Sequence, residues 1–341
     1  MTEPARVVRL GFLDALRAVA AVMVMIEHFR GSARLARLQY QYVSLGIAGV
    51  LTFFLCSGFI IPRSLERTRN LRVFWANRVA RLWPAYLVTL ALVLVATQGW
   101  TSGFSDPIEF TPTSIATNLT MLAGFQGTPW IDQSWTLTYE LVFYGLITAL
   151  AAATLLRRSD VLAGLALSGT LLAAVAPGLR DHPYIWRSAF WIATMFVGLV
   201  VYDAFEGRLP AAAAWIALAA GVLTGEASLA LSGHADIFSA SIRWSFLVGY
   251  GVFAIGYALR THPFPAVLRR VGLVSYSLYL THKLVIYFVP DTGIGWLSAL
   301  IWSVGAWALA EVGFRFVERP AMAVTRRRRS ASGTGPPPAG Q

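Results

Sequence analysis

Long apolar stretches recur along the whole chain, and each is about as long as a helix that crosses a bilayer. A span needs ~20 mostly apolar residues, and we count about ten such segments in the 341 residues. They lie near residues 10–29, 43–62, 82–98, 138–156, 161–177, 186–204, 211–232, 242–259, 272–290 and 294–314. A soluble core does not need a chain that is 56% hydrophobic and only 13% charged. The sequence therefore predicts an all-α polytopic membrane protein with about ten transmembrane helices.

The arginines predict the orientation of these spans. A cytoplasmic N-terminus puts most arginine-bearing loops on the inner side, as the positive-inside rule requires. These residues are Arg6, Arg9, Arg63, Arg67, Arg69, Arg72, Arg78, Arg81, Arg157, Arg158, Arg208, Arg260, Arg269, Arg270 and Arg326 to Arg329. The predicted outer loop 99–137 has acidic residues and no Lys or Arg, whereas Arg30, Arg34 and Arg37 would lie outside, against the rule. We expect a multi-pass protein of a bacterial plasma membrane with both termini cytoplasmic.

The same arginines account for the formal charge of +11. Because they flank spans and no nucleic-acid-binding motif surrounds them, we expect a lipid bilayer and no nucleic acid as the partner. Residues 1–320 are predicted to form one membrane-embedded domain, followed by a basic and then Pro/Gly-rich disordered cytoplasmic tail, 321–341. The single cysteine, Cys56, excludes an internal disulfide. No histidines or acidic residues have the spacing of metal ligands, so we predict no metal site.

Four ionisable residues, Asp14, Arg17, Glu27 and His28, lie in or beside the first predicted span. Charged groups are costly in a membrane and are functional candidates by default. Arg17 and His28 are eleven residues apart, which is close to three helical turns and places them on one face, ~16 Å apart along the axis. The alternative is structural: an ion pair of Asp14 with Arg17, and a histidine at the membrane interface.

Further motifs follow the first span in a fixed order. They are FF-x-x-SGF at residues 53–59, an R-x-x-R-x-x-P turn at 78–84, W-T-L-x-x-E at 135–140 and Y-x-L-Y-L-x-H at 276–282. Together with the Asp-x-x-Arg and Arg-x10-His spacings of the first span, they resemble the integral-membrane acyltransferase 3 family over residues 8–320. Two positions depart from the pattern: Ala15 stands where many members have Gly, and Leu141 replaces the second residue of a Glu pair.

The resemblance implies an acyl-CoA-dependent O-acyltransferase. Such an enzyme moves an acyl group, usually acetyl, from a coenzyme A thioester to a hydroxyl of a carbohydrate or a hydroxylated natural product. The acyl-CoA would be a donor substrate, and no permanently bound cofactor is expected. The acceptor could be a glycan, a glycolipid or a macrolide-like molecule, and the chemistry could take place at either membrane face.

The resemblance and the chemistry together assign candidate catalytic residues. A neutral imidazole can take the hydroxyl proton near pH 7, which makes His28 the candidate general base. A covalent acyl-imidazole on His28 is the alternative. Glu140 or Glu27 could orient His28, and the family pattern favours Glu140. The structural alternative for Glu140 is a charge at the end of a span.

The remaining candidates would bind the substrates. Arg17, Arg78 and Arg81 could hold the phosphates of coenzyme A, because the planar guanidinium forms paired hydrogen bonds with phosphate. Anchoring of the chain to the inner face is the alternative for Arg78 and Arg81. Trp135 and His282 are the candidate substrate-binding residues. Aromatic residues at a membrane interface and a histidine bonded to the backbone are their structural alternatives.

A different class of protein also fits buried charges on one helix face. A proton-coupled transporter or exporter of a small polar solute would use such groups as a proton relay. Its flux would depend on a proton gradient and would continue without coenzyme A. An enzyme would consume acyl-CoA instead, and the order of the motifs favours the enzyme.

Overall fold

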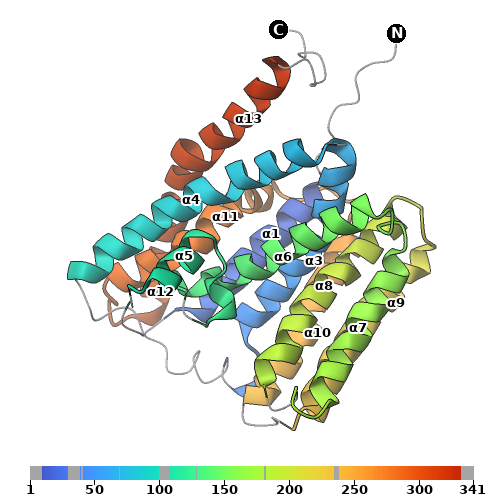
Figure 1. Ribbon diagram of the computed structural model, residues 1–341. Helices are drawn as coiled ribbons and strands as arrows, with labels where there is room; N and C mark the ends of the chain where they lie inside the picture. Colours follow the sequence, from blue (N-terminus) through green and yellow to red (C-terminus); the bar gives the residue numbers. More distant parts are fainter. Residues whose placement is uncertain are drawn as a thin grey trace. The chain divides into compact units, whose positions relative to one another are not determined.

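The apolar segments form helices. The computed structural model describes residues 10–29, 39, 41–68, 70–99, 108, 110–127, 129–179, 182–233 and 238–331. Within these ranges the elements are helices joined by turns, and none is a strand (Figure 1). A lipid environment offers no partner to a backbone N–H or C=O, so a helix, which pairs both internally, is the structure that an apolar run can adopt there.

Each of the ten predicted segments coincides with a helix. The helices are α1 (Gly11–Glu27), α3 (Leu45–Thr68), α4 (Leu71–Gly99), α6 (Trp135–Ala152), α7 (Ser159–Val175), α8 (Pro183–Phe205), α9 (Ala211–Leu231), α10 (Phe238–Ala258), α11 (Ala266–Phe288) and α12 (Gly295–Gly313). Among the described residues, six helical runs are long and apolar enough to cross a membrane: Leu45–Thr68, Leu71–Ala96, Asp132–Ala152, Tyr184–Phe205, Ala211–Leu231 and Gly295–Thr325. The prediction of an all-α polytopic membrane protein is confirmed by the helical structure and by these six candidate spans.

The third predicted segment, 82–98, begins too late. Helix α4 starts at Leu71 and continues through Pro84, so Arg78 and Arg81 lie within the helix and the predicted R-x-x-R-x-x-P turn is wrong. Proline disfavours a helical conformation of the residue before it. This local preference is weak against a long apolar helix, and membrane helices tolerate proline where neighbouring groups satisfy the freed carbonyl.

The chain divides into two compact units. The first contains residues 1–27, 33–59 and 158–275, and the second contains residues 28–32, 60–157 and 276–341. In the first unit α7 packs against both α8 and α9, α10 packs against α9, and α1 packs against α10. Helix α11 approaches α1 closely at Gly272, where a β-carbon would overlap the carbonyl oxygen of Asp14.

The second unit contains the long loop between α4 and α6. This loop includes the short helix α5 (Pro112–Leu119) and two 3-10 turns, η1 (Ala123–Phe125) and η2 (Asp132–Ser134). After α12 the chain makes a π-helical turn, η3 (Phe314–Glu318), and continues as α13 (Arg319–Ala331). Both η3 and α13 pack against α4. Helix α13 covers the start of the predicted tail 321–341, and residues 332–341 lie outside the described residues.

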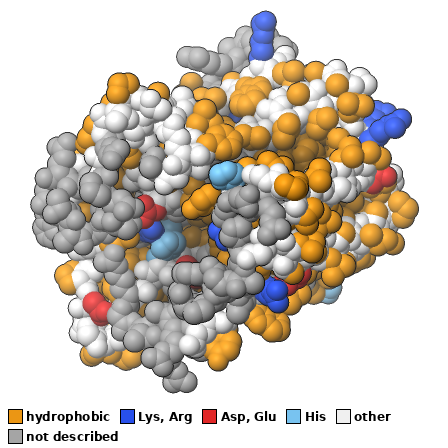
Figure 2. All heavy atoms as spheres, turned by 60° about the horizontal axis from the view of Figure 1, so that its bottom comes forward, with side chains coloured by type: hydrophobic (Ala, Val, Ile, Leu, Met, Phe, Trp, Pro, Cys, Tyr) orange, Lys and Arg blue, Asp and Glu red, His pale blue; other side chains and the backbone are white. Residues whose placement is uncertain are grey.

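Apolar side chains are widely exposed on the surface of the helices. On α7 and α9 the exposed fractions of Leu165, Leu172, Ile216 and Leu223 are 66%, 62%, 67% and 67%. Figure 2 shows hydrophobic side chains over much of the face on view, with charged groups scattered between them. Large exposed apolar areas are unusual for a soluble monomer. They are expected where lipid is the solvent.

The glycine of the FF-x-x-SGF motif allows two helices to touch. A β-carbon at Gly58 on α3 would overlap the carbonyl oxygen of Met195 on α8, and a β-carbon at Gly198 would overlap the carbonyl oxygen of Leu55. Small residues at such contacts are the usual means of close helix packing in membranes.

We expect Gly58→Ala to lower the free energy of unfolding by about 1–3 kcal/mol, because the added methyl group has no space. Thermal unfolding of the protein in nanodiscs measures the change. Gly169→Ala on α7 is the matched control, since nothing lies within 4 Å of a β-carbon there. Equal unfolding temperatures for the two variants would contradict close packing at Gly58.

Candidate active site

Two histidines from distant parts of the sequence meet in the second unit. Helix α1 ends at Glu27, and His28 follows it directly, while His282 lies within α11. Nδ1 of His28 is 3.2 Å from Nε2 of His282, and the ring centroids are 5.1 Å apart. His282 is 1% exposed. The contact joins the predicted base, His28, to a residue predicted to bind substrate.

The other ring nitrogen of His282 faces its own helix. Nδ1 lies 3.1 Å from the carbonyl oxygen of Leu278, one turn earlier on α11. The ring of Tyr279 lies beside His282 with a centroid distance of 6.3 Å. These contacts hold the His282 imidazole from two sides, so its orientation toward His28 is fixed by the fold.

The segment before α6 is fastened to the same turn of α11. Nε2 of Gln133 donates to the carbonyl oxygens of Leu280 at 2.8 Å and Tyr279 at 3.2 Å. In return the Tyr279 hydroxyl donates to the carbonyl oxygen of Gln133 at 2.6 Å and also contacts the hydroxyl of Thr136 at 2.9 Å. Gln133 is only 5% exposed. This polar network holds in place the turn that precedes His282.

An ion pair supports the same junction. Nζ of Lys283 lies 2.6 Å from Oδ2 of Asp132, so the residue after His282 is bound to the residue before Gln133. No motif or spacing in the sequence predicts these contacts. Gln133 lies two residues before the first residue of the W-T-L-x-x-E motif, but nothing in its spacing indicates a partner 146 residues away.

We expect Gln133→Met to lower the free energy of unfolding by about 1–3 kcal/mol, because a buried side chain would lose two hydrogen bonds to backbone carbonyls. Thermal unfolding in nanodiscs measures this loss. Gln126→Met is the control, since Gln126 belongs to the same loop and is exposed. A Gln133 variant as stable as the Gln126 variant would show that the bonds to α11 contribute nothing.

Glu140 and Arg78 belong to a second polar group in this unit. The Tyr144 hydroxyl donates to Oε1 of Glu140 at 2.7 Å. The guanidinium of Arg78 lies 5.7 Å from the centroid of the Tyr144 ring and 5.6 Å from that of Phe74. Its Nη2 donates to the hydroxyl of Ser64 at 3.0 Å. Tyr144 thus connects residues that the sequence predicted for separate roles.

The charged residues of α1 have different surroundings. Glu27 accepts hydrogen bonds from the Ser44 hydroxyl at 2.9 Å and from the backbone N–H of Gly46 at 3.2 Å. A carboxylate bound to a free N–H at the start of α3 stabilises that helix end. Asp14 is buried, and Arg17 is partly exposed. Both are close enough to the buried thiol of Cys56 to act on it electrostatically.

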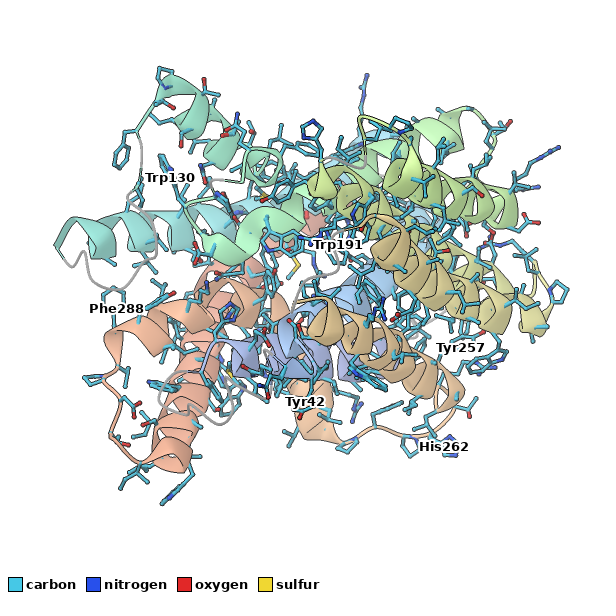
Figure 3. All side chains as sticks on the ribbon, turned by 90° about the horizontal axis from the view of Figure 1, so that it is seen from below. Tyr42, Trp130, Trp191, Tyr257, His262 and Phe288 are labelled. Atoms are coloured by element: carbon cyan, nitrogen blue, oxygen red, sulfur yellow. The ribbon has the colours of Figure 1, made fainter. Side chains whose placement is uncertain are left out.

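Two tryptophans near the start of α6 have different surroundings. Trp135 is partly exposed at the first position of α6, and its ring packs edge-on against Tyr139 at 5.9 Å. Trp130, which Figure 3 shows beside α5, donates from Nε1 to the Ser114 hydroxyl at 3.0 Å and packs against Phe110. Trp130 therefore connects two parts of the loop.

Arg81 is partly exposed on α4. Within the described ranges no three His, Cys, Asp or Glu residues are grouped as metal ligands.

Comparisons with known proteins identify the family. A family model described as an acyltransferase domain, Acyl_transf_3, matches residues 10–312. Nodulation protein 10 of Rhizobium leguminosarum bv. viciae is 29% identical, over 91% of this chain and 92% of its own length. Acyltransferase MdmB of Streptomyces mycarofaciens is 27% identical, over 98% and 97%. Exopolysaccharide production protein ExoZ of Rhizobium meliloti is 26% identical, over 86% and 95%. No solved structure matches. Since the family model covers most of the sequence, the chain belongs to this acyltransferase family and is an O-acyltransferase.

Proposed function

We propose that the enzyme moves an acetyl group from acetyl-CoA to a hydroxyl of a carbohydrate or a glycosylated natural product, with His28 as the general base. The observation that carries the proposal is the contact of His28 with the buried His282 at 3.2 Å, in a chain that belongs to an acyltransferase family. A histidine oriented by a second side chain is a recurring feature of catalytic bases.

In the proposed reaction one proton is transferred twice, first from the acceptor hydroxyl to His28 and then from His28 to the sulfur of coenzyme A. The acceptor hydroxyl gives its proton to His28 while its oxygen attacks the carbonyl carbon of the thioester. When the tetrahedral intermediate collapses, the carbon–sulfur bond breaks and coenzyme A leaves as a thiolate. The imidazolium of His28 then returns the proton to the sulfur. The products are the O-acetyl ester and free coenzyme A.

Arg78 is our first candidate for the phosphates of the donor. Its Nε atom is buried and has no hydrogen-bond partner among the described residues, and its Nη2 donates to the neutral hydroxyl of Ser64. A partly buried cation whose Nε donor is buried and unused favours an anionic ligand. Arg81, three residues further along α4, and Arg17 on α1 are the additional candidates for phosphate binding.

The acceptor is proposed from chemistry and from the relatives. The name of ExoZ refers to exopolysaccharide production, which supports a carbohydrate or glycolipid as the acceptor. Trp135, partly exposed at the start of α6, offers an aromatic surface on which a sugar ring can pack. Glu140 is proposed to act in the same site through its bond with Tyr144.

We place the enzyme in a bacterial plasma membrane with ten spans and both termini cytoplasmic. The helices at all ten apolar segments and the distribution of arginines support this topology. Exposure of residues at the two chain ends to an impermeant label, in inside-out and right-side-out vesicles, tests it.

Release of free coenzyme A from acetyl-CoA by the purified enzyme in lipid nanodiscs tests the function. The acceptor panel contains oligosaccharides, a glycolipid and a glycosylated macrolide, and empty nanodiscs are the control. We expect release only when both protein and an acceptor are present, with the acetyl ester found on the acceptor by mass spectrometry. Flux of a solute driven by a proton gradient, without consumption of acetyl-CoA, would instead support the transporter.

A further inference from the structure

The two nitrogens of His282 have different partners, and these partners define its tautomer. The carbonyl oxygen of Leu278 can only accept a hydrogen bond, so Nδ1 of His282, 3.1 Å away, carries a proton and donates it. His282 is 1% exposed, and a charge on its ring would be buried beside the ammonium of Lys283. The fold therefore favours a neutral ring, whose Nε2 has a lone pair and accepts.

The tautomer of His282 determines that of His28. Because Nε2 of His282 accepts, Nδ1 of His28, 3.2 Å away, must be the donor. A neutral His28 with its proton on Nδ1 has its lone pair on Nε2. The hydrogen bonds thus run in one direction, from His28 to His282 and from His282 to the backbone carbonyl of Leu278.

We propose that His282 is a positioning residue that holds His28 in the Nδ1–H tautomer, so that Nε2 is the atom that removes the acceptor's proton. This inference rests on the proposed function of His28 and assigns the reacting atom. With the opposite tautomer, His28 would present an N–H to the acceptor hydroxyl and could not take its proton. A second group that sets the tautomer of a catalytic histidine is a common requirement in acyl transfer.

The surroundings of His282 fit a positioning role better than contact with substrate. The imidazole is buried, and its two nitrogens are bound to His28 and Leu278. The neighbouring charge of Lys283 is paired with Asp132 at 2.6 Å, and the ring of Tyr279 covers another side. We therefore assign His282 a role that acts through His28, in place of the substrate-binding role expected from the sequence.

Nitrogen-15 NMR of histidine-labelled enzyme in nanodiscs tests the inference directly, because the two tautomers give different ring-nitrogen shifts. The chain has five histidines, and the loss of signals in His28→Gln assigns those of His28. In the wild type we expect a protonated Nδ1 and an unprotonated Nε2. A wild-type His28 with its proton on Nε2 would overturn the proposal.

Two variants of His282 separate tautomer control from simple packing. His282→Phe keeps an aromatic ring without nitrogens, and we expect the Nε2–H tautomer of His28 to become the major form. His282→Gln supplies an amide oxygen near the position of the lost Nε2, and we expect it to restore the Nδ1–H form. An unchanged tautomer in folded His282→Phe would refute the role, as would failure of His282→Gln to restore it.

The assay of coenzyme A release distinguishes this inference from the proposed function. If the NMR results are as expected but no variant and no acceptor supports release, the hydrogen-bond chain stands and the enzymatic assignment of His28 fails. If release depends on His28 but its tautomer does not depend on His282, the function stands and the positioning role fails.

Discussion

Replacement of His28 by alanine is expected to lower kcat/KM for acceptor-dependent release of coenzyme A by about 10²–10⁴-fold, the range for loss of a general base. The imidazole would no longer be present to take the hydroxyl proton, and the acceptor would have to attack as a neutral alcohol. Initial rates of free thiol formation, measured with the acceptor found in the panel, give the ratio.

The matched control is His262→Ala. His262 follows α10 and is exposed, and it is labelled in Figure 3. We expect the rate of the His262→Ala enzyme to stay within about twofold of the wild-type rate, since a substitution at an exposed position has little effect on stability. A His28→Ala enzyme with wild-type rates would exclude His28 as the base and turn attention to Glu140.

The covalent alternative makes a separate prediction. If His28 were the nucleophile, enzyme mixed with labelled acetyl-CoA and no acceptor would retain label after the small molecules are removed. One equivalent of coenzyme A would be released in a burst. General base catalysis predicts neither result, because the acetyl group is transferred directly to the acceptor without an acetyl-enzyme intermediate.

The positions of the helices could be predicted because lipid allows few alternatives. An apolar run in a bilayer must satisfy its own backbone, so the run itself marks the helix. The segment predicted at 211–232 is helix Ala211–Leu231, and that predicted at 10–29 is Gly11–Glu27. The start of α4 was missed because its first turns contain arginines and polar residues, which interrupt the apolar run by which a span is identified.

The site was predicted only as single residues. His28 and His282 each stood out as ionisable groups in apolar sequence, but their contact joins residues 254 positions apart. The partner of a side chain at that separation depends on how the helices pack, which spacing along one helix does not reveal. Gln133 is a clearer case, since a glutamine before a helix is ordinary in sequence and its two bonds to α11 exist only in the fold.

The two carboxylates expected to orient His28 both have other hydrogen-bond partners in the fold. Glu27 was an alternative partner for His28, but its carboxylate accepts from Ser44 and Gly46 at the start of α3. Glu140 was the favoured partner, and it accepts from Tyr144. Among the described side chains, His282 contacts the ring of His28, and the sequence suggested another role for His282.

Replacement of Arg78 by methionine is expected to weaken binding of coenzyme A by about 10–100-fold. A hydrogen bond to a charged group contributes about 1.5–3 kcal/mol, and each 1.4 kcal/mol is about tenfold in affinity. Isothermal titration of coenzyme A into nanodisc-bound enzyme measures the dissociation constant. Arg72→Met is the matched control, because Arg72 is exposed on the same helix and its loss removes the same charge.

Two further measurements separate phosphate binding by Arg78 from its packing against Phe74 and Tyr144. Arg78→Lys keeps the charge but loses the planar fork, so we expect binding weaker than wild type and stronger than Arg78→Met. Dephospho-coenzyme A, which lacks the 3′-phosphate, tests which group is held. If Arg78 binds that phosphate, the wild type binds dephospho-coenzyme A more weakly than coenzyme A. Arg78→Met then binds the two ligands with equal affinity. An Arg78→Met enzyme that binds coenzyme A as tightly as Arg72→Met would leave Arg78 with a structural role, through its packing on the aromatic rings and its hydrogen bond to Ser64.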